Sequence, residues 1–274
     1  MTAPNTPLTR SNDSLADLVE VMRRLRAPEG GCPWDLEQTF ETIAPYTIEE
    51  AYEVADAIER GDLSDLREEL GDLLLQVVFH SQMAKEQGAF DIKDVARSIV
   101  DKMEQRHPHV FGDVDVADAD AQTFAWETMK AAERARKANG RAPSALDGVA
   151  LALPALMRAE KLQKRAARTG FDWPTPTEIF DKLDEETAEL KDAIASGDTR
   201  HMAEEVGDLL FVAANLARKL KIDPEEALRA ANSKFERRFR AMERAAETNA
   251  QTFSELDLDA QEALWTQVKQ DERA

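Results

Sequence analysis

Apolar residues recur at intervals of three and four along most of the chain, which is the spacing of one face of an α-helix. Near the N-terminus this period links Leu15, Leu18, Val19, Met22 and Leu25. It also predicts helices over residues 63–87, 92–106, 121–138, 154–168, 177–195, 199–221 and 224–248. Alternating runs rich in Val, Ile and aromatic residues, which would indicate strands, are nearly absent. We therefore predict an all-α fold in which each half is a small helix bundle.

The polar positions carry a second pattern, an acidic segment that occurs twice. Residues 49–62 read EEAYEVADAIERGD and residues 185–198 read EETAELKDAIASGD. Each copy runs on into a segment ending in E-E-x-G-D-L-L. An offset of 136 residues maps the first acidic set onto the second, namely Glu49, Glu50, Glu53, Glu69 and Asp72 onto Glu185, Glu186, Glu189, Glu205 and Asp208. Exposed charges contribute little individually to stability, so a shared spacing calls for a geometric reason.

A hairpin of two antiparallel helices supplies that reason. Gly61 in the first copy and Gly197 in the second predict the turn, because Gly commonly ends a helix. At about 1.5 Å of rise per residue, Glu53 and Glu69 lie at similar heights on the two helices of the first hairpin. The spacings of three and four residues keep each acidic set on one helical face. The carboxylates of each copy should therefore converge.

Two glycines inside the predicted helices need a separate explanation. Gly71 and Gly207 each precede the last Asp of the pattern. Gly in a helix interior costs about 1 kcal/mol relative to Ala. We expect close backbone approach at both positions.

Several carboxylates in one small volume cannot all stay ionised at neutral pH unless their pKa values rise or a cation binds. Mg²⁺ and Mn²⁺ prefer oxygen ligands, so either ion suits such a cluster. We predict a metal site in at least one copy. The alternatives are solvated acidic helix faces, or a duplicated fold in which a site is vestigial.

Charge and cysteine content narrow the class of protein. The net charge of -19 argues against binding to polymeric nucleic acid, which needs a basic surface. A phosphate-bearing small molecule remains compatible if metal ions neutralise it. Cys32 is the only cysteine, the N-terminus has no apolar signal core, and no segment reaches the length of a membrane span. We expect a soluble, cytoplasmic protein without disulfide or membrane.

The length of 274 residues accommodates two domains. The helical period is interrupted at Gly140, Pro143, Gly148 and Pro154. We predict an N-terminal repeat over 1–138, a linker over 139–153 and a C-terminal repeat over 154–274.

Other motifs add to the acidic helices: GCPWD at 31–35, KFERRF at 234–239 and WTQVK at 265–269. Together they make nearly the whole chain resemble a two-repeat MazG-type nucleoside triphosphate pyrophosphohydrolase. The carboxylate pattern alone is shared by the wider all-α pyrophosphohydrolase superfamily, which includes dimeric dUTPases. The resemblance implies Mg²⁺-dependent hydrolysis of a nucleoside triphosphate to monophosphate and pyrophosphate, by a homodimer.

The resemblance also implies roles for particular residues. Metal positions match Glu186, Glu189, Glu205 and Asp208, with Glu49, Glu50, Glu53, Glu69 and Asp72 as the second, vestigial or active, set. Nucleotide-contact positions match Lys182, Glu185, Lys234, Arg238 and Trp265. Glu186, a member of the metal set, is expected to contact the nucleotide as well. We assign catalytic roles to Glu185, Glu205 and Lys234.

The residues themselves fit this assignment. The chain has no Gly-rich phosphate loop, so cationic side chains must approach the phosphates from outside the carboxylates. Lys234, Arg237 and Arg238 suit that role, because Arg can hold phosphate oxygens through two donors. Their alternative role is to neutralise an acidic surface. Trp265 could stack on a base or simply pack.

The second half is the better candidate for the complete site. In the first half, Pro108 ends the helix that precedes it. The equivalent helix of the second half, around Lys234, continues for several turns. We therefore expect the second cluster to support catalysis and the first to be dispensable. Competing functions are a helical dimerisation protein with vestigial metal sites and a narrower dUTPase-like pyrophosphatase.

Overall fold

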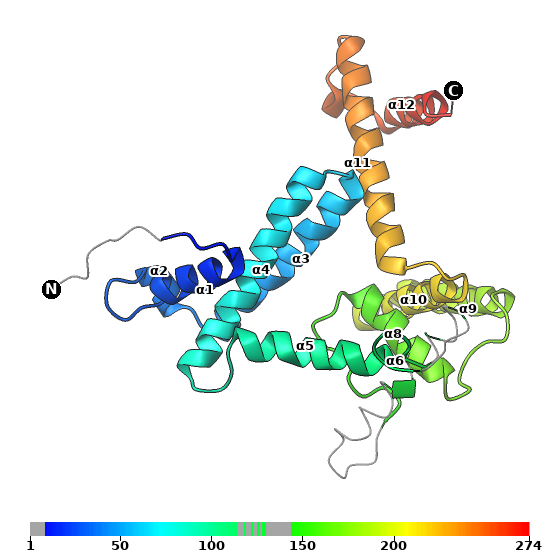
Figure 1. Ribbon diagram of the computed structural model, residues 1–274. Helices are drawn as coiled ribbons and strands as arrows, with labels where there is room; N and C mark the ends of the chain where they lie inside the picture. The colour runs from blue at the N-terminus through cyan, green and yellow to red at the C-terminus, as the bar shows by residue number, and fades with distance from the viewer. Residues whose placement is uncertain are drawn as a thin grey trace. The chain divides into compact units, whose positions relative to one another are not determined.

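The computed structural model describes residues 9–113, 118, 122, 125, 126, 128, 129 and 144–273. All regular elements in these ranges are helices, which confirms the predicted all-α class. The chain divides into two compact units, Met1–Met129 and Lys130–Ala274 (Figure 1).

The first unit is organised around a long antiparallel hairpin. Its described helices are α1 (Ser14–Leu25), α2 (Pro33–Glu37), α3 (Phe40–Arg60), α4 (Leu63–Glu86), α5 (Ile92–Arg106) and α6 (Pro108–Phe111). Helices α3 and α4 lie side by side, and α1 and α5 both pack against α4. The short helices α2 and α6 each begin at a proline, which is suited to the first helical position. They are too short for apolar periodicity to predict.

The core of the first unit lies where α1, α3 and α4 meet. Its buried side chains are Met22, Ile43, Val78, Phe79 and Met83. Burial of each such side chain contributes about 1.5–3 kcal/mol relative to exposure. The apolar faces of these three helices pack together, and this packing stabilises the hairpin on one of its sides.

The turn between α3 and α4 is determined by two residues. Gly61 has φ 69°, the left-handed conformation that ends many helices. Asp62 then caps α4, accepting hydrogen bonds from the backbone N–H groups of Ser64 and Asp65. Such caps typically stabilise by about 1 kcal/mol. The predicted hairpin turn is confirmed.

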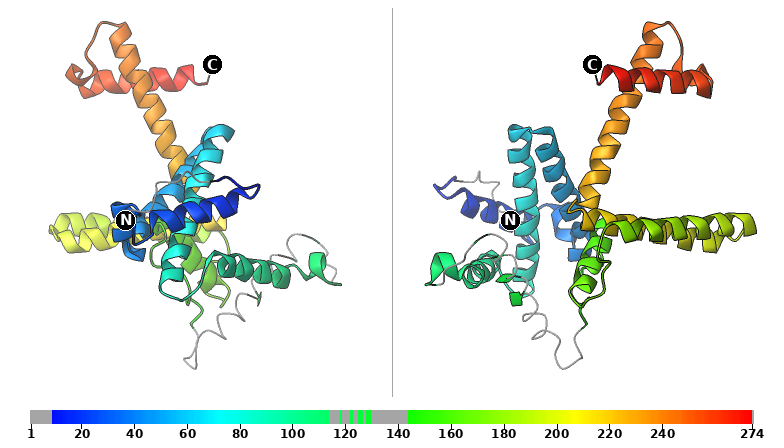
Figure 2. Two further views of the ribbon diagram at one scale, coloured as in Figure 1. Left: turned by 60° about the vertical axis from the view of Figure 1, so that its left-hand side comes forward. Right: turned by 90° about the vertical axis from the view of Figure 1, so that its right-hand side faces the viewer.

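The second unit repeats this hairpin and extends it. Its described helices are α8 (Ala155–Ala167), α9 (Thr177–Ser196), α10 (Thr199–Lys219), α11 (Pro224–Thr248), the 3₁₀ helix η1 (Phe253–Glu255) and α12 (Leu258–Asp271). Helix α9 pairs with α10, and α8 packs on α10. Gly197 has φ 73° and Asp198 caps α10, as in the first hairpin. Helix α11 contacts α8 and α10 and also carries η1 and α12 (Figure 2).

Part of the predicted organisation lies outside the described residues. This applies to most of the helix expected over 121–138 and to residues 139–143 of the predicted linker. The boundaries proposed for the two repeats remain a prediction. Among the helices that are described, none combines the length and apolar character needed to cross a membrane.

Candidate metal centre

The hairpin of α9 and α10 brings three carboxylates of the second half together. Glu186 projects from α9, and Glu205 and Asp208 project from α10; one ligand oxygen of each lies within 4.8 Å of the others. Glu186 is 4% exposed and Glu205 is 8% exposed. The buried Oε2 atom of Glu205 has no hydrogen-bond partner among the described residues. A buried carboxylate oxygen without a partner is costly, and a cation with oxygen ligands would satisfy it.

Glu189 lies one helical turn beyond Glu186 on α9. Desolvation and then the negative charges of Glu205 and Glu186 raise the pKa of its carboxyl above the usual value. The group of oxygens within 4.8 Å does not include Glu189. Its carboxylate therefore adds negative charge beside the three converging oxygens.

Two cationic or titratable side chains lie against this cluster. Lys182 Nζ donates to Glu185 at 2.9 Å and to Glu186 at 2.7 Å. Both hydrogen bonds, Glu186 first, raise the pKa of Lys182 above its usual value. His201 Nε2 lies 2.8 Å from Oε1 of Glu205. Sequence reasoning missed His201, although its position four residues before Glu205 on one helix face was a signal.

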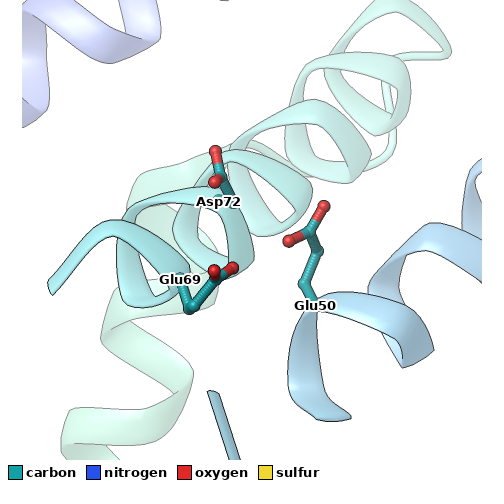
Figure 3. A group of neighbouring side chains, drawn as sticks. All are labelled: Glu50, Glu69 and Asp72. Atoms are coloured by element: carbon teal, nitrogen blue, oxygen red, sulfur yellow. The ribbon is translucent and has the colours of Figure 1, made fainter. Parts of the chain in front are cut away.

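The first half repeats the triad with Glu50 on α3 and Glu69 and Asp72 on α4. Their ligand oxygens also lie within 4.8 Å of one another, and Figure 3 shows the three side chains converging across the hairpin. Desolvation and the charge of Asp72 raise the pKa of Glu50, and desolvation and the charge of Glu53 raise the pKa of Glu69. The two remaining members of the predicted set, Glu49 and Glu53, are exposed on α3 and lie outside this triad.

The two clusters differ in the residues around the shared carboxylates. At the offset of 136 residues, Tyr46 stands where the second half has Lys182, and Asp65 stands where it has His201. Asp65 forms an ion pair with Arg60 at the hairpin turn. Neither substituted side chain supplies positive charge to the first cluster. Mutual repulsion is therefore better compensated in the second half.

The predicted phosphate-binding side chains form a separate group on α11 and α12. The Arg238 guanidinium lies 5.5 Å from the centre of the Trp265 ring. Arg238 Nε donates to Glu272 at 2.7 Å, and Arg237 Nη2 lies 3.0 Å from the same carboxylate. Lys234 is exposed on α11. The structure thus gathers Arg237, Arg238 and Trp265, with Glu272 as a partner that sequence reasoning missed.

This cationic group and the α9–α10 carboxylates are not in contact. Helix α12 packs on α11, and Figures 1 and 2 show it at the end of α11 remote from α10. Among the described residues, no hydrogen bond or ion pair joins Arg237, Arg238 or Trp265 to the carboxylate cluster. Of the predicted cationic contacts, Lys182 alone pairs with the acidic residues in the part of the chain that the structure describes.

The expected close approach at the two helix-interior glycines is wrong for the described part of the chain. A Cβ atom added to Gly71 or to Gly207 would meet nothing within 4 Å. Both glycines lie on open helix surface, because the core of each unit is built on the other faces of the hairpin. The neighbouring side chains Leu70 and Val206 are also exposed.

Comparison with known proteins agrees with this arrangement. Residues 38–111 and 174–242 match the MazG nucleotide pyrophosphohydrolase domain, one segment around each carboxylate cluster. A nucleoside triphosphate pyrophosphohydrolase of Escherichia coli K12 is 51% identical over 259 residues, covering 93% of this chain and 97% of that protein. The nucleoside triphosphate pyrophosphohydrolase/pyrophosphatase MazG of Thermotoga maritima is 44% identical over 254 residues, covering 92% and 94%. The chain therefore belongs to the MazG nucleotide pyrophosphohydrolase family, in the form with two MazG domains.

Proposed function

We propose that this protein is a nucleoside triphosphate pyrophosphohydrolase, which cleaves between the α and β phosphates to release monophosphate and pyrophosphate. The observation that carries the proposal is the convergence of Glu186, Glu205 and Asp208, with a buried oxygen of Glu205 lacking a partner. Family membership and near full-length relatives of that activity support it.

In this proposal Glu186, Glu189, Glu205 and Asp208 hold Mg²⁺, with Mn²⁺ as a substitute of similar ligand preference. The bound ion supplies charge neutralisation on the phosphates and a template for in-line attack by water. Glu186 and Glu205 suit this role because burial leaves them few other partners. The first cluster is a second site of the same kind, either working or vestigial.

The remaining residues of the proposed site act on the nucleotide. Lys234, Arg237 and Arg238 are proposed to bind phosphate oxygens, although they do not contact the α9–α10 carboxylates within the described part of this chain, since a guanidinium can offer two parallel donors to one phosphate. Trp265 offers a ring on which a base can stack. Glu185 and Lys182 form the edge of the metal cluster, where Lys182 orients both neighbouring carboxylates. We assign the catalytic roles to Glu185, Glu205 and Lys234.

We also propose that the protein acts as a homodimer of chains with repeats at 1–138 and 154–274. Leu70, Leu74 and Val77 form an exposed apolar stripe on α4, and Val206 and Leu210 repeat it on α10. Contiguous apolar surface of this kind marks an interaction site. A second copy covering it would also explain the open glycines beside each stripe.

Product analysis tests the proposed activity. Purified protein is incubated with each nucleoside triphosphate and Mg²⁺, and the products are separated by anion exchange. Monophosphate plus pyrophosphate is the expected outcome, and chelation of the metal should abolish it. Diphosphate plus orthophosphate would require another reaction class. No product from any nucleotide would favour a helical interaction protein with vestigial sites, and activity restricted to dUTP would favour the narrower pyrophosphatase.

A further inference from the structure

One carboxylate joins the two arginines that we place on the phosphate chain. Arg238 Nε donates to Oε2 of Glu272 at 2.7 Å, while Arg237 Nε and Nη2 lie 3.1 and 3.0 Å from Oε1. Each oxygen of Glu272 therefore faces its own guanidinium. Arg238 and Glu272 are partly buried, with side chains 18% and 27% exposed, whereas the Arg237 side chain is 61% exposed.

A carboxylate between two guanidiniums is chemically similar to a phosphate in the same place. Both anions accept charge-assisted hydrogen bonds from the fork of an arginine. Hydrogen bonds from Arg238 and then Arg237 hold the pKa of Glu272 below its usual value, so the group is ionised at neutral pH. The arginines that would meet the nucleotide thus already hold an anion.

The Glu272 carboxylate can move away from the arginines without disrupting α12 or the packing of Arg238. Glu272 is the C-cap residue of α12, beyond the last helical residue, Asp271. Arg238 keeps a second contact, since its guanidinium lies over the Trp265 ring. Val268 is buried one turn earlier and anchors α12 to the unit. Release of Glu272 therefore exposes both arginines, and Arg238 stays in contact with the Trp265 ring.

We propose that Glu272 is an internal competitor for the phosphate chain, occupying Arg237 and Arg238 until a more highly charged anion displaces it. This inference rests on the proposed function, because it takes these arginines as phosphate ligands. Glu272 then sets substrate affinity: a triphosphate or pyrophosphate brings several oxygens and more than one charge to the two guanidiniums. A ligand with a single charge gains little over the carboxylate that it replaces.

Direct binding measurements test the competition. Calorimetry with Mg²⁺ and a nonhydrolysable nucleoside triphosphate analogue compares the unmodified protein with Glu272→Gln. Loss of the competing charge should tighten binding about three- to tenfold, the range expected for displacing a partly buried ion pair. Asp271→Asn is the matched control, because it removes the same charge from the adjacent residue, whose carboxylate pairs only with Gln267 in the described structure. It should change affinity less than about twofold, as for a surface charge.

A double-mutant cycle checks that the effect passes through the arginine. In an Arg238→Gln background, Glu272→Gln should give a clearly smaller gain in affinity, because half of the contact is already lost. Unchanged or weaker binding by Glu272→Gln overturns the proposal. Weaker binding together with lost helicity, measured by circular dichroism, would make Glu272 a purely structural residue and overturn it equally.

The outcome can be separated from that of the proposed activity. If the unmodified protein releases pyrophosphate and Glu272→Gln binds the analogue with unchanged affinity, only the proposal that Glu272 is a competitor is refuted. If the analogue binds but no pyrophosphate is released from any nucleotide, the proposed activity is refuted. The ratio of the affinities of the unmodified protein and Glu272→Gln then still decides the role of Glu272.

Discussion

At the scale of single residues, the two carboxylate clusters differ in the side chains that pair with their acids, not in the acids themselves. Both contain the same three converging acids. Only the second has Lys182 on Glu186 and His201 beside Glu205. A positive charge at hydrogen-bond distance offsets the repulsion that a buried carboxylate cluster otherwise suffers. In the second cluster Lys182 supplies this charge to the buried Glu186.

Substitution of the matching glutamates tests which cluster serves catalysis. Glu205→Ala removes a buried oxygen ligand, and we expect pyrophosphate release to fall more than about 100-fold, since even outer-shell partners of a metal typically cost 10–100-fold. Glu69→Ala, the equivalent change in the first half, should leave substantial activity. The measurement is initial rate of pyrophosphate release at saturating Mg²⁺. Equal losses from both variants would contradict the assignment to the second half.

Removal of Lys182 should separate metal binding from nucleotide binding. In Lys182→Met, Glu185 and Glu186 lose their cation, so Mn²⁺ should bind about two- to fivefold more tightly, because the metal no longer competes with the lysine for these carboxylates. The nonhydrolysable nucleotide should bind more weakly. Electron paramagnetic resonance of Mn²⁺ and calorimetry report the two affinities. Lys191→Met, an exposed position on the same helix, is the control, and weaker Mn²⁺ binding in Lys182→Met would show that the lysine positions the ligands instead.

At the scale of elements, the unit of function is the helical hairpin. Each hairpin ends its first helix on a left-handed glycine, Gly61 or Gly197, and starts its second on a capping Asp. This turn sets the register between the helices, and the register decides which acids face each other. The spacing of the acids predicted their convergence, and the structure places Glu186, Glu205 and Asp208 together while leaving Glu185 outside the triad.

The turn glycine can be tested without touching the acids. Gly197→Ala forces a Cβ into a conformation with φ 73°, which should lower the free energy of unfolding by about 1–2 kcal/mol. Gly197→Asn should cost clearly less, because Asn tolerates the left-handed region. Urea unfolding followed by circular dichroism compares the variants. Identical costs for Ala and Asn would indicate that the backbone conformation is not what requires glycine here.

At the scale of the whole molecule, each unit leaves an apolar face uncovered. Leu74 on α4 and Leu210 on α10 occupy equivalent positions and are 40% and 54% exposed. A Cβ atom added to either of the neighbouring glycines would meet nothing within 4 Å. Small residues permit close helix approach, so the two observations suit one interface better than solvent. The proposed homodimer would use these faces.

A charged substitution in the stripe tests the dimer. Leu210→Glu places a charge in the proposed interface, which is costly to bury without a partner, and should convert the dimer to monomer. Leu74→Glu should do the same if the first unit also takes part. Size-exclusion chromatography with light scattering gives the mass. Leu151→Glu, at an 83% exposed position outside either stripe, should leave the mass unchanged. An unmodified protein that is already monomeric would refute the dimer.

The sequence by itself determined the helical class, the duplicated hairpins and the acids that converge, because these depend on short-range periodicity and on turn chemistry that a few adjacent residues specify. Only the tertiary structure decided how each acid is compensated and what the arginines hold. The contact between Arg238 and Glu272 joins residues 34 apart, and it exists because α12 crosses α11 and packs on it (Figure 2). Such contacts depend on how helices pack against one another, which no local spacing encodes.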